Sequence, residues 1–181
     1  MTSLTRDPLL AIAKGVLWFL MGAMAIGGFA SLVAMPLLII FQDEAAIQIA
    51  KDAPEIPMPD FIGALLLILA CVVVLLGMLF RLFQLLKRIV DTVGEGDPFV
   101  PENARRLTQM AWLSLGVQLA ALPIGAIGLW IEEVTEGKGG AEITVDSGLS
   151  GNGLLLMLIL FILARVFRQG AAMRAELEGT V

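Results

Sequence analysis

The sequence predicts an all-α membrane protein with four transmembrane helices. Of its 181 residues, 58% are apolar and 16% are charged, whereas soluble domains are roughly 45–50% apolar and about 25% charged. The charged residues cluster between long apolar runs, and a run of about 20 residues is enough to cross about 30 Å of hydrocarbon. Because these runs do not alternate polar and apolar residues, we expect spanning helices and not barrel strands.

The expected spans lie at about residues 15–41, 61–86, 109–131 and 150–169. Arg6 and Lys14 resemble the basic start of a secretory signal, but the first run far exceeds the roughly 7–15 apolar residues of such a signal. We therefore interpret it as a retained span. The last run is long enough only with its flanking residues included, and the long stem of Arg165 can reach the interface from within the span.

Basic residues predict the orientation of the spans. Ten of the twelve lysines and arginines fall on the side of the N-terminus, and only Lys51 and Lys138 fall on the other side. The positive-inside rule then places both termini in the cytoplasm. The outer loops, 42–60 and 132–149, carry ten acidic residues, so the net charge of −5 does not describe one uniform acidic surface. The inner loop covers residues 94–103.

The residue types predict no catalytic chemistry. Histidine is absent, and the single cysteine, Cys71, lies in the middle of the second span. The chain therefore lacks the usual general base, a disulfide framework and a plausible set of metal ligands. The glycines of the inner loop match no phosphate-binding motif. We expect no enzyme activity, no cofactor and no metal.

A transport pathway would normally place ionisable or strongly polar groups within the spans. Gln118 is the only plausible polar contact in the middle of the predicted bundle, and we interpret it as an interhelical hydrogen bond, with a substrate site as the alternative. Small residues that permit close helix packing recur at every fourth position in two spans. In the first span they are Ala23, Gly27 and Ser31, and in the third they are Ala121 and Gly125. The packing they permit could be within one chain or between two copies.

The second and fourth helices are expected to continue into the cytoplasm as amphipathic extensions. Apolar positions recur at helical spacing while arginines take another face. These two extensions need something to bury against, either each other or a partner. The first stripe consists of Leu82, Leu86, Ile89 and Val93, and the second of Val166, Gly170, Met173 and Leu177.

The inner loop has the residues of a turn followed by a helix start. Gly94 and Gly96 predict the end of the second helix, and two X-Pro pairs bias the next residues toward extended or turn geometry. Asn103 is predicted to cap the third helix. Phe99 is an apolar residue in a polar loop, so we expect it to tuck under the helices or to meet a partner.

Two stretches, "VGEGDPFVPENARRL" (93–107) and "LARVFRQGAAMRAELEGTV" (163–181), together resemble a bacterial family of integral membrane proteins named domain of unknown function 2975. The resemblance implies a small four-span protein of the bacterial inner membrane, with no established chemistry. The positions that match the family's pattern are Asp97, Pro98, Phe99, Asn103, Arg105, Arg106, Phe167, Arg168, Gly170, Arg174 and Glu176.

Members of that family are often encoded beside a short helix-turn-helix regulator. The resemblance thus implies a regulatory protein that binds or sequesters such a regulator in the cytoplasm, without binding DNA itself, since its basic surface is small. One alternative is a transport or channel-forming subunit that oligomerises. The other is that the inner loop and the C-terminal tail have a structural role only and hold the helix bundle together. The candidate contact residues are Asp97, Phe99, Asn103, Arg105, Arg106, Arg165, Arg168, Met173, Arg174 and Glu176.

Overall fold

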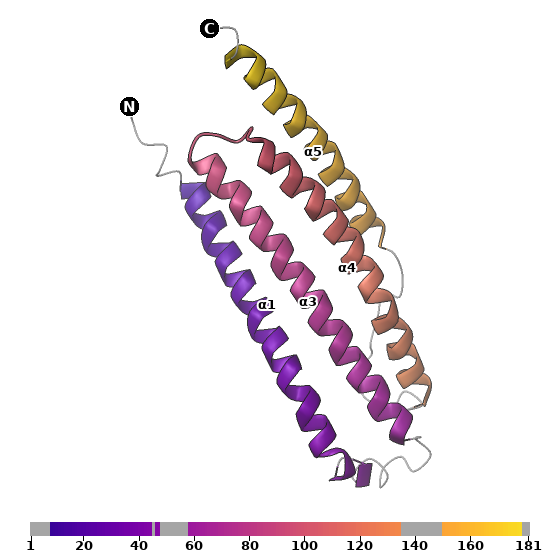
Figure 1. Ribbon diagram of the computed structural model, residues 1–181. Helices are drawn as coiled ribbons and strands as arrows, with labels where there is room; N and C mark the ends of the chain where they lie inside the picture. Colours follow the sequence, from indigo (N-terminus) through magenta and orange to yellow (C-terminus); the bar gives the residue numbers. More distant parts are fainter. Residues whose placement is uncertain (1–7, 45, 48–57, 135–149, 179–181) are drawn as a thin grey trace. The chain divides into compact units, whose positions relative to one another are not determined.

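The computed structural model describes residues 8–44, 46–47, 58–134 and 150–178. Most of the two predicted outer loops, at 48–57 and 135–149, therefore lies outside the described residues. The described part is mainly helical and confirms the predicted all-α class with four long apolar helices (Figure 1). These helices are α1 (Pro8–Ile40), α3 (Met58–Gly94), α4 (Pro101–Val134) and α5 (Gly151–Glu178).

Each of the four helices is long and apolar enough to cross a membrane, as expected of a multi-pass membrane protein. The shortest, α5, has 28 residues, and the longest, α3, has 37. At 1.5 Å per residue these helices are roughly 42 and 55 Å long, which exceeds the roughly 30 Å of a bilayer's hydrocarbon. Each helix is thus longer than an untilted span needs, which leaves length for the predicted extensions of α3 and α5.

Contacts group the chain into two compact units. The first unit combines Met1–Met24, Met78–Val117 and Gly151–Val181, and the second combines Ala25–Gly77 and Gln118–Ser150. Three of the helices contribute a segment to both units, whereas α5 belongs to the first unit alone.

An apolar core holds α3, α4 and α5 together within the first unit. Ala111 on α4 is 0% exposed, and its small side chain permits close approach of the neighbouring helices. Beside this core, the ring of Trp112 meets that of Phe161 edge-on at 5.5 Å, an orientation that aromatic pairs favour. The buried residues of the core are Leu85, Ile89, Leu107, Met110, Ala111, Leu160 and Ala164.

In the second unit, α1 and α3 come close at a glycine. A Cβ added at Gly27 would lie 3.3 Å from Cδ1 of Leu76, which is tighter than an ordinary contact. Ser31 Oγ donates a hydrogen bond of 2.9 Å to the carbonyl of Gly27, so this hydroxyl needs no partner on another helix. The predicted small-residue packing is thus present at Gly27, whereas Ala23 is exposed.

Candidate functional site

A tight turn ends α3 in the first unit. Gly96 has a φ of 84°, a backbone conformation that favours glycine. The backbone amides of residues 95–97 donate hydrogen bonds of 3.0 to 3.1 Å to the carbonyls of Asp91, Val93 and Thr92, respectively. These bonds satisfy carbonyls that the helix end would otherwise leave without partners. The predicted helix end at this glycine pair is confirmed.

The side chain of Asn103 ties this turn to both flanking helices. It is 0% exposed. Its Nδ2 donates hydrogen bonds to Oγ1 of Thr92 at 2.7 Å and to the carbonyl of Pro98 at 2.9 Å. Its Oδ1 accepts a hydrogen bond of 2.7 Å from Nη1 of Arg106. The amide thus uses both of its donors and its acceptor, as a buried polar group must to avoid a desolvation cost.

This arrangement contradicts the predicted capping role of Asn103. The helix α4 begins at Pro101, two residues earlier. Proline suits the first position of a helix because its missing N–H would have no partner there and its φ is already helical. The backbone amide of Asn103 therefore bonds to the carbonyl of Val100 at 3.0 Å, and its side chain is free to bridge two helices.

The inner turn also contacts α5 through Phe99. The rings of Phe99 and Phe167 lie 5.4 Å apart at an interplanar angle of 46°. A Cβ added at Gly170 would come within 2.6 Å of Cδ1 of Phe99, so the absence of a side chain there lets the ring lie against the helix. Of the two outcomes predicted for Phe99, packing under a helix is therefore present, although the residue keeps 41% of its surface exposed.

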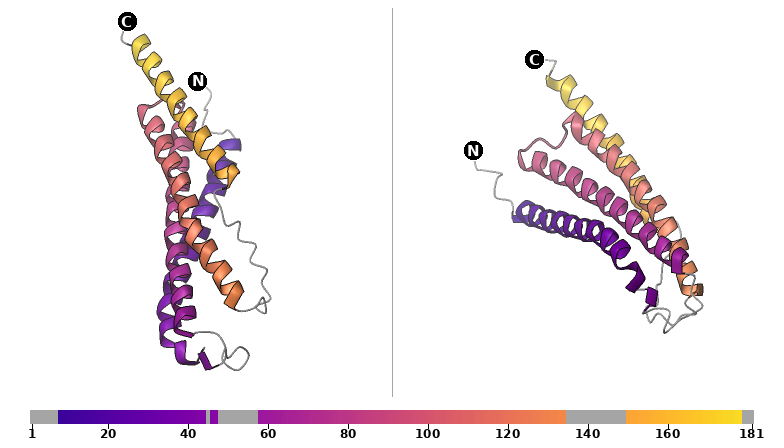
Figure 2. Two further views of the ribbon diagram at one scale, coloured as in Figure 1. Left: turned by 90° about the vertical axis from the view of Figure 1, so that its right-hand side faces the viewer. Right: turned by 60° about the horizontal axis from the view of Figure 1, so that its bottom comes forward.

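One helical turn beyond Gly170, Arg174 forms an ion pair with Asp97. The two side chains are 47% and 37% exposed, so solvent weakens the attraction and we assign it about 0.2–1 kcal/mol. The ion pair lies one turn from the contact between Phe99 and Gly170, so both contacts are made in the same register of α5. Figure 2 shows that the last turns of α5 continue past the α3–α4 turn in both views.

The face of α5 that meets the turn is not the predicted apolar stripe. Phe167, Gly170 and Arg174 make the contacts. The remaining members of the stripe, Val166, Met173 and Leu177, are 50%, 60% and 72% exposed. Of the two outcomes left open for this stripe, burial within the chain is therefore present only at Gly170, because close packing against an aromatic ring selects a glycine and not the most apolar face.

A charge cluster that the sequence analysis did not single out joins α1 to α3 in the first unit. Both carboxylate oxygens of Asp91 are engaged, one by Lys14 at 2.8 Å and the other by Lys87 at 2.9 Å. The Nζ atom of Lys87 also lies 5.6 Å from the ring centroid of Trp18, within cation–π range. The spacing of Lys87 and Asp91 at i and i+4 signals half of this cluster, but nothing in the sequence pairs Lys14 with it.

The other predicted contact residues divide into buried and exposed groups. Asn103 is buried and Arg106 is half-buried, so these two hold the turn and offer little surface to a partner. The side chains of Arg105, Arg165, Arg168, Met173 and Glu176 are exposed.

Gln118, in the second unit, differs from its prediction. It is 8% exposed, yet neither its Nε2 nor its Oε1 has a hydrogen-bond partner among the described residues. The expected interhelical hydrogen bond is therefore absent, since the spans carry few polar side chains that could meet the amide. Leaving such a group buried and unpaired costs about 1–3 kcal/mol.

No group of acidic, cysteine or histidine side chains in the described part of the chain could hold a metal ion.

Replacing Asn103 by alanine should lower the stability of the first unit markedly. Asn103→Ala removes three hydrogen bonds and leaves the Thr92 and Pro98 groups without their buried partner, so we expect a loss of roughly 2–4 kcal/mol and a clear drop in Tm. Thermal unfolding in detergent, followed by circular dichroism, measures this. Glu102→Ala, at an exposed neighbour, is the control and should change Tm little. Equal Tm values for the two variants would contradict the network.

The contact between Phe99 and α5 can be tested with a double-mutant cycle. Gly170→Ala should destabilise the protein by about 1–3 kcal/mol, because the new methyl group overlaps the Phe99 ring. In a Phe99→Ala background the same substitution should be neutral or slightly stabilising, since alanine favours the helix and the clash is gone. Tm values of the four proteins measure the coupling. A Gly170→Ala effect of the same size in both backgrounds would show that the ring is elsewhere.

The amino-acid sequence of this chain matches a known family. The sequence model of a family described as "Protein of unknown function (DUF2975)" matches residues 39–181, which include the α3–α4 turn and the whole of α5. No curated protein and no solved structure matches the chain significantly. Because the match extends over 143 of the 181 residues (39 to 181 inclusive), the chain belongs to the DUF2975 family.

Proposed function

We propose that this chain is a regulatory protein of the bacterial inner membrane that binds a cytoplasmic helix-turn-helix regulator through the end of α5. One observation carries the proposal, namely an exposed apolar stripe on a helix end that the α3–α4 turn holds in place. This exposed stripe consists of Val166, Met173 and Leu177, which lie at i, i+7 and i+11 on one side of α5.

The charge distribution supports a cytoplasmic position for this stripe. The positive-inside count, ten basic residues against two, favours an orientation with both termini, the α3–α4 turn and the end of α5 in the cytoplasm. Met173 lies eight residues past Arg165, about 12 Å farther along the helix, in a segment that also holds Arg168 and Glu176. Met173 and Leu177 lie past residue 169, where the predicted span ends, so these exposed side chains would face water, and a partner that covered them would gain hydrophobic free energy.

The contacts on the adjoining face of α5 make it suitable for recognition. Phe167, Gly170 and Arg174 hold the helix against the turn, so its end is ordered before any partner arrives. Binding to a preformed helix avoids the entropy cost of ordering it. A helix with apolar residues at these spacings is the kind of ligand that an apolar groove on another protein accepts. Methionine and arginine, both present here, are enriched at such interfaces.

The choice of a helix-turn-helix protein as the partner rests on the family resemblance. Direct DNA binding by this chain is a weaker alternative, because few arginines surround the stripe and Glu176 lies among them. The bilayer is the other expected partner.

The competing proposal is a small transport or channel-forming subunit. It is supported by Gln118, a buried amide with no partner among the described residues, which a solute, a water molecule or a second copy could satisfy. It gives no role to the exposed stripe of α5, so we favour the regulatory function.

The decisive experiment compares two doubly substituted proteins purified in mild detergent from the native host. Met173→Glu with Leu177→Glu places two charges in the exposed stripe, whereas Ala172→Glu with Ala175→Glu places two charges at exposed positions on the far side of the same helix. We expect a stoichiometric helix-turn-helix protein, identified by mass spectrometry, to co-purify with the wild type and with the Ala172→Glu, Ala175→Glu control. The amount that co-purifies with the Met173→Glu, Leu177→Glu variant should be at least tenfold lower, and the Tm of this variant should be unchanged.

Two results would contradict the regulatory function. One is the absence of any helix-turn-helix protein from the wild-type preparation. The other is equal recovery of that protein with both variants. Solute or ion flux in proteoliposomes that Gln118→Leu abolishes would instead support the transport function.

A further inference from the structure

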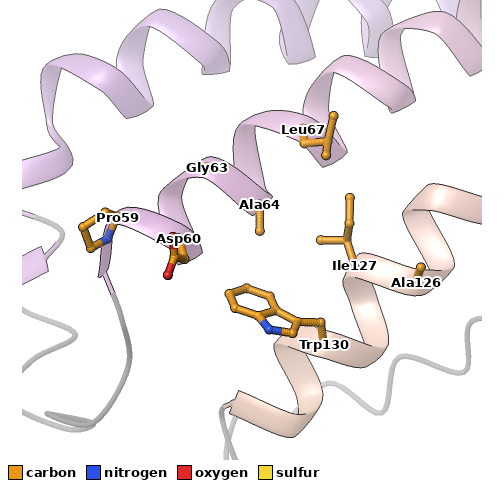
Figure 3. A pocket seen from close by; sticks show the side chains of 8 residues that line it. All are labelled: Pro59, Asp60, Gly63, Ala64, Leu67, Ala126, Ile127 and Trp130. Atoms are coloured by element: carbon orange, nitrogen blue, oxygen red, sulfur yellow. The ribbon is translucent and has the colours of Figure 1, made fainter.

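A pocket of about 470 Å³ lies between α3 and α4 within the second unit (Figure 3). Its size is within the roughly 300–1,000 Å³ typical of small-molecule sites. The first turns of α3 form one wall, and the last turns of α4 form the other. The lining residues are Pro59, Asp60, Gly63, Ala64, Leu67, Ala126, Ile127 and Trp130.

The lining is apolar except at one end. Ala64, Leu67 and Ile127 provide aliphatic surface, while Asp60 contributes a carboxylate and Trp130 an indole. Figure 3 shows the Asp60 carboxylate and the Trp130 ring projecting from their helices toward the same space. Gly63 lies between Asp60 and Leu67 and carries no side chain that could fill that space.

The charge around this pocket has one sign. Asp60 is the one charged residue of its lining, and residues 58–67 and 126–134, which form its two walls, contain no lysine or arginine. Asp60 also lies in the first turn of α3, where the helix dipole favours a negative charge. An anionic ligand would be repelled here, and a neutral one would leave the carboxylate unused. A cation would gain from the carboxylate and from the face of the indole, the aromatic ring that binds cations best.

We propose that this pocket binds an amphiphilic organic cation, a molecule with an apolar body and a quaternary or protonated nitrogen or an equivalent onium centre. The positive centre lies between the carboxylate of Asp60 and the ring of Trp130. The apolar body lies against Ala64, Leu67 and Ile127. This site is independent of the regulator-binding surface on α5, so either can fail without the other.

A simpler role for Trp130 is that of an interfacial anchor, since tryptophans gather where membrane helices leave the hydrocarbon. Trp130 itself is half-buried and lines the pocket together with an acid on another helix. An interfacial anchor needs no acid beside it, so the carboxylate of Asp60 favours the cation-binding role of Trp130.

The test uses the purified full-length protein in lipid nanodiscs and a matched pair of probes. Tetraphenylphosphonium and tetraphenylborate share one shape and size and differ in the sign of their charge. Equilibrium dialysis, corrected for uptake by empty nanodiscs, should show saturable binding of the cation near one equivalent and no saturable binding of the anion. Asp60→Asn and Trp130→Leu should each weaken cation binding about tenfold or more, which corresponds to about 1.4 kcal/mol.

Glu133→Gln is the control, because it removes an exposed acid that does not line the pocket, and it should leave the affinity within about twofold. Far-ultraviolet circular dichroism confirms that each variant is folded. Equal saturable binding of both probes would overturn the proposal, as would unchanged cation affinity in folded Asp60→Asn. A phospholipid that remains bound at one equivalent and is not displaced by the cation would also overturn it.

Discussion

The buried amide of Asn103 is the interaction on which the rest of the first unit depends. It connects the last turn of α3, through Thr92, with the inner turn, through Pro98, and with the first turn of α4, through Arg106. An amide this deeply buried is stabilising only while every donor and acceptor is used, so the backbone around it has little freedom. That rigidity places Phe99 and Asp97 where α5 can meet them.

The position of α5 follows from a second constraint, which is steric. The Phe99 ring occupies the space that a side chain at Gly170 would need, and Phe167 packs against the same ring. The ion pair between Asp97 and Arg174 is too exposed to contribute much free energy, so it adds only a small preference for the register that the Phe99–Gly170 contact selects. The hydrogen bonds of Asn103, the packing of Phe99 and the exposed ion pair thus together order the end of α5, whose adjoining apolar stripe stays exposed.

The sequence was sufficient to predict the class of the fold, because apolar runs of membrane length leave helices as the favoured structure. It also predicted a helix end near Gly96 and the importance of Phe99, since a glycine and an isolated aromatic residue in a polar loop are local signals. It could not predict that Asn103 would bridge two helices instead of capping one, because that depends on Thr92 and Pro98, which come near only in the folded chain. The same limit applies to Lys14 with Asp91, and to the face of α5 that meets the turn.

Cross-linking in native membranes is the most direct measurement of whether the end of α5 is held against the turn. In a Cys71→Ser background, Asp97→Cys with Arg174→Cys should be joined rapidly by a short bifunctional thiol reagent, because these side chains meet. Asp97→Cys with Ala172→Cys, whose second site lies on another side of the helix, should react much more slowly. Equal rates for the two pairs would mean that α5 turns freely past the inner loop, and would contradict the ordered helix end on which the proposed regulator binding depends.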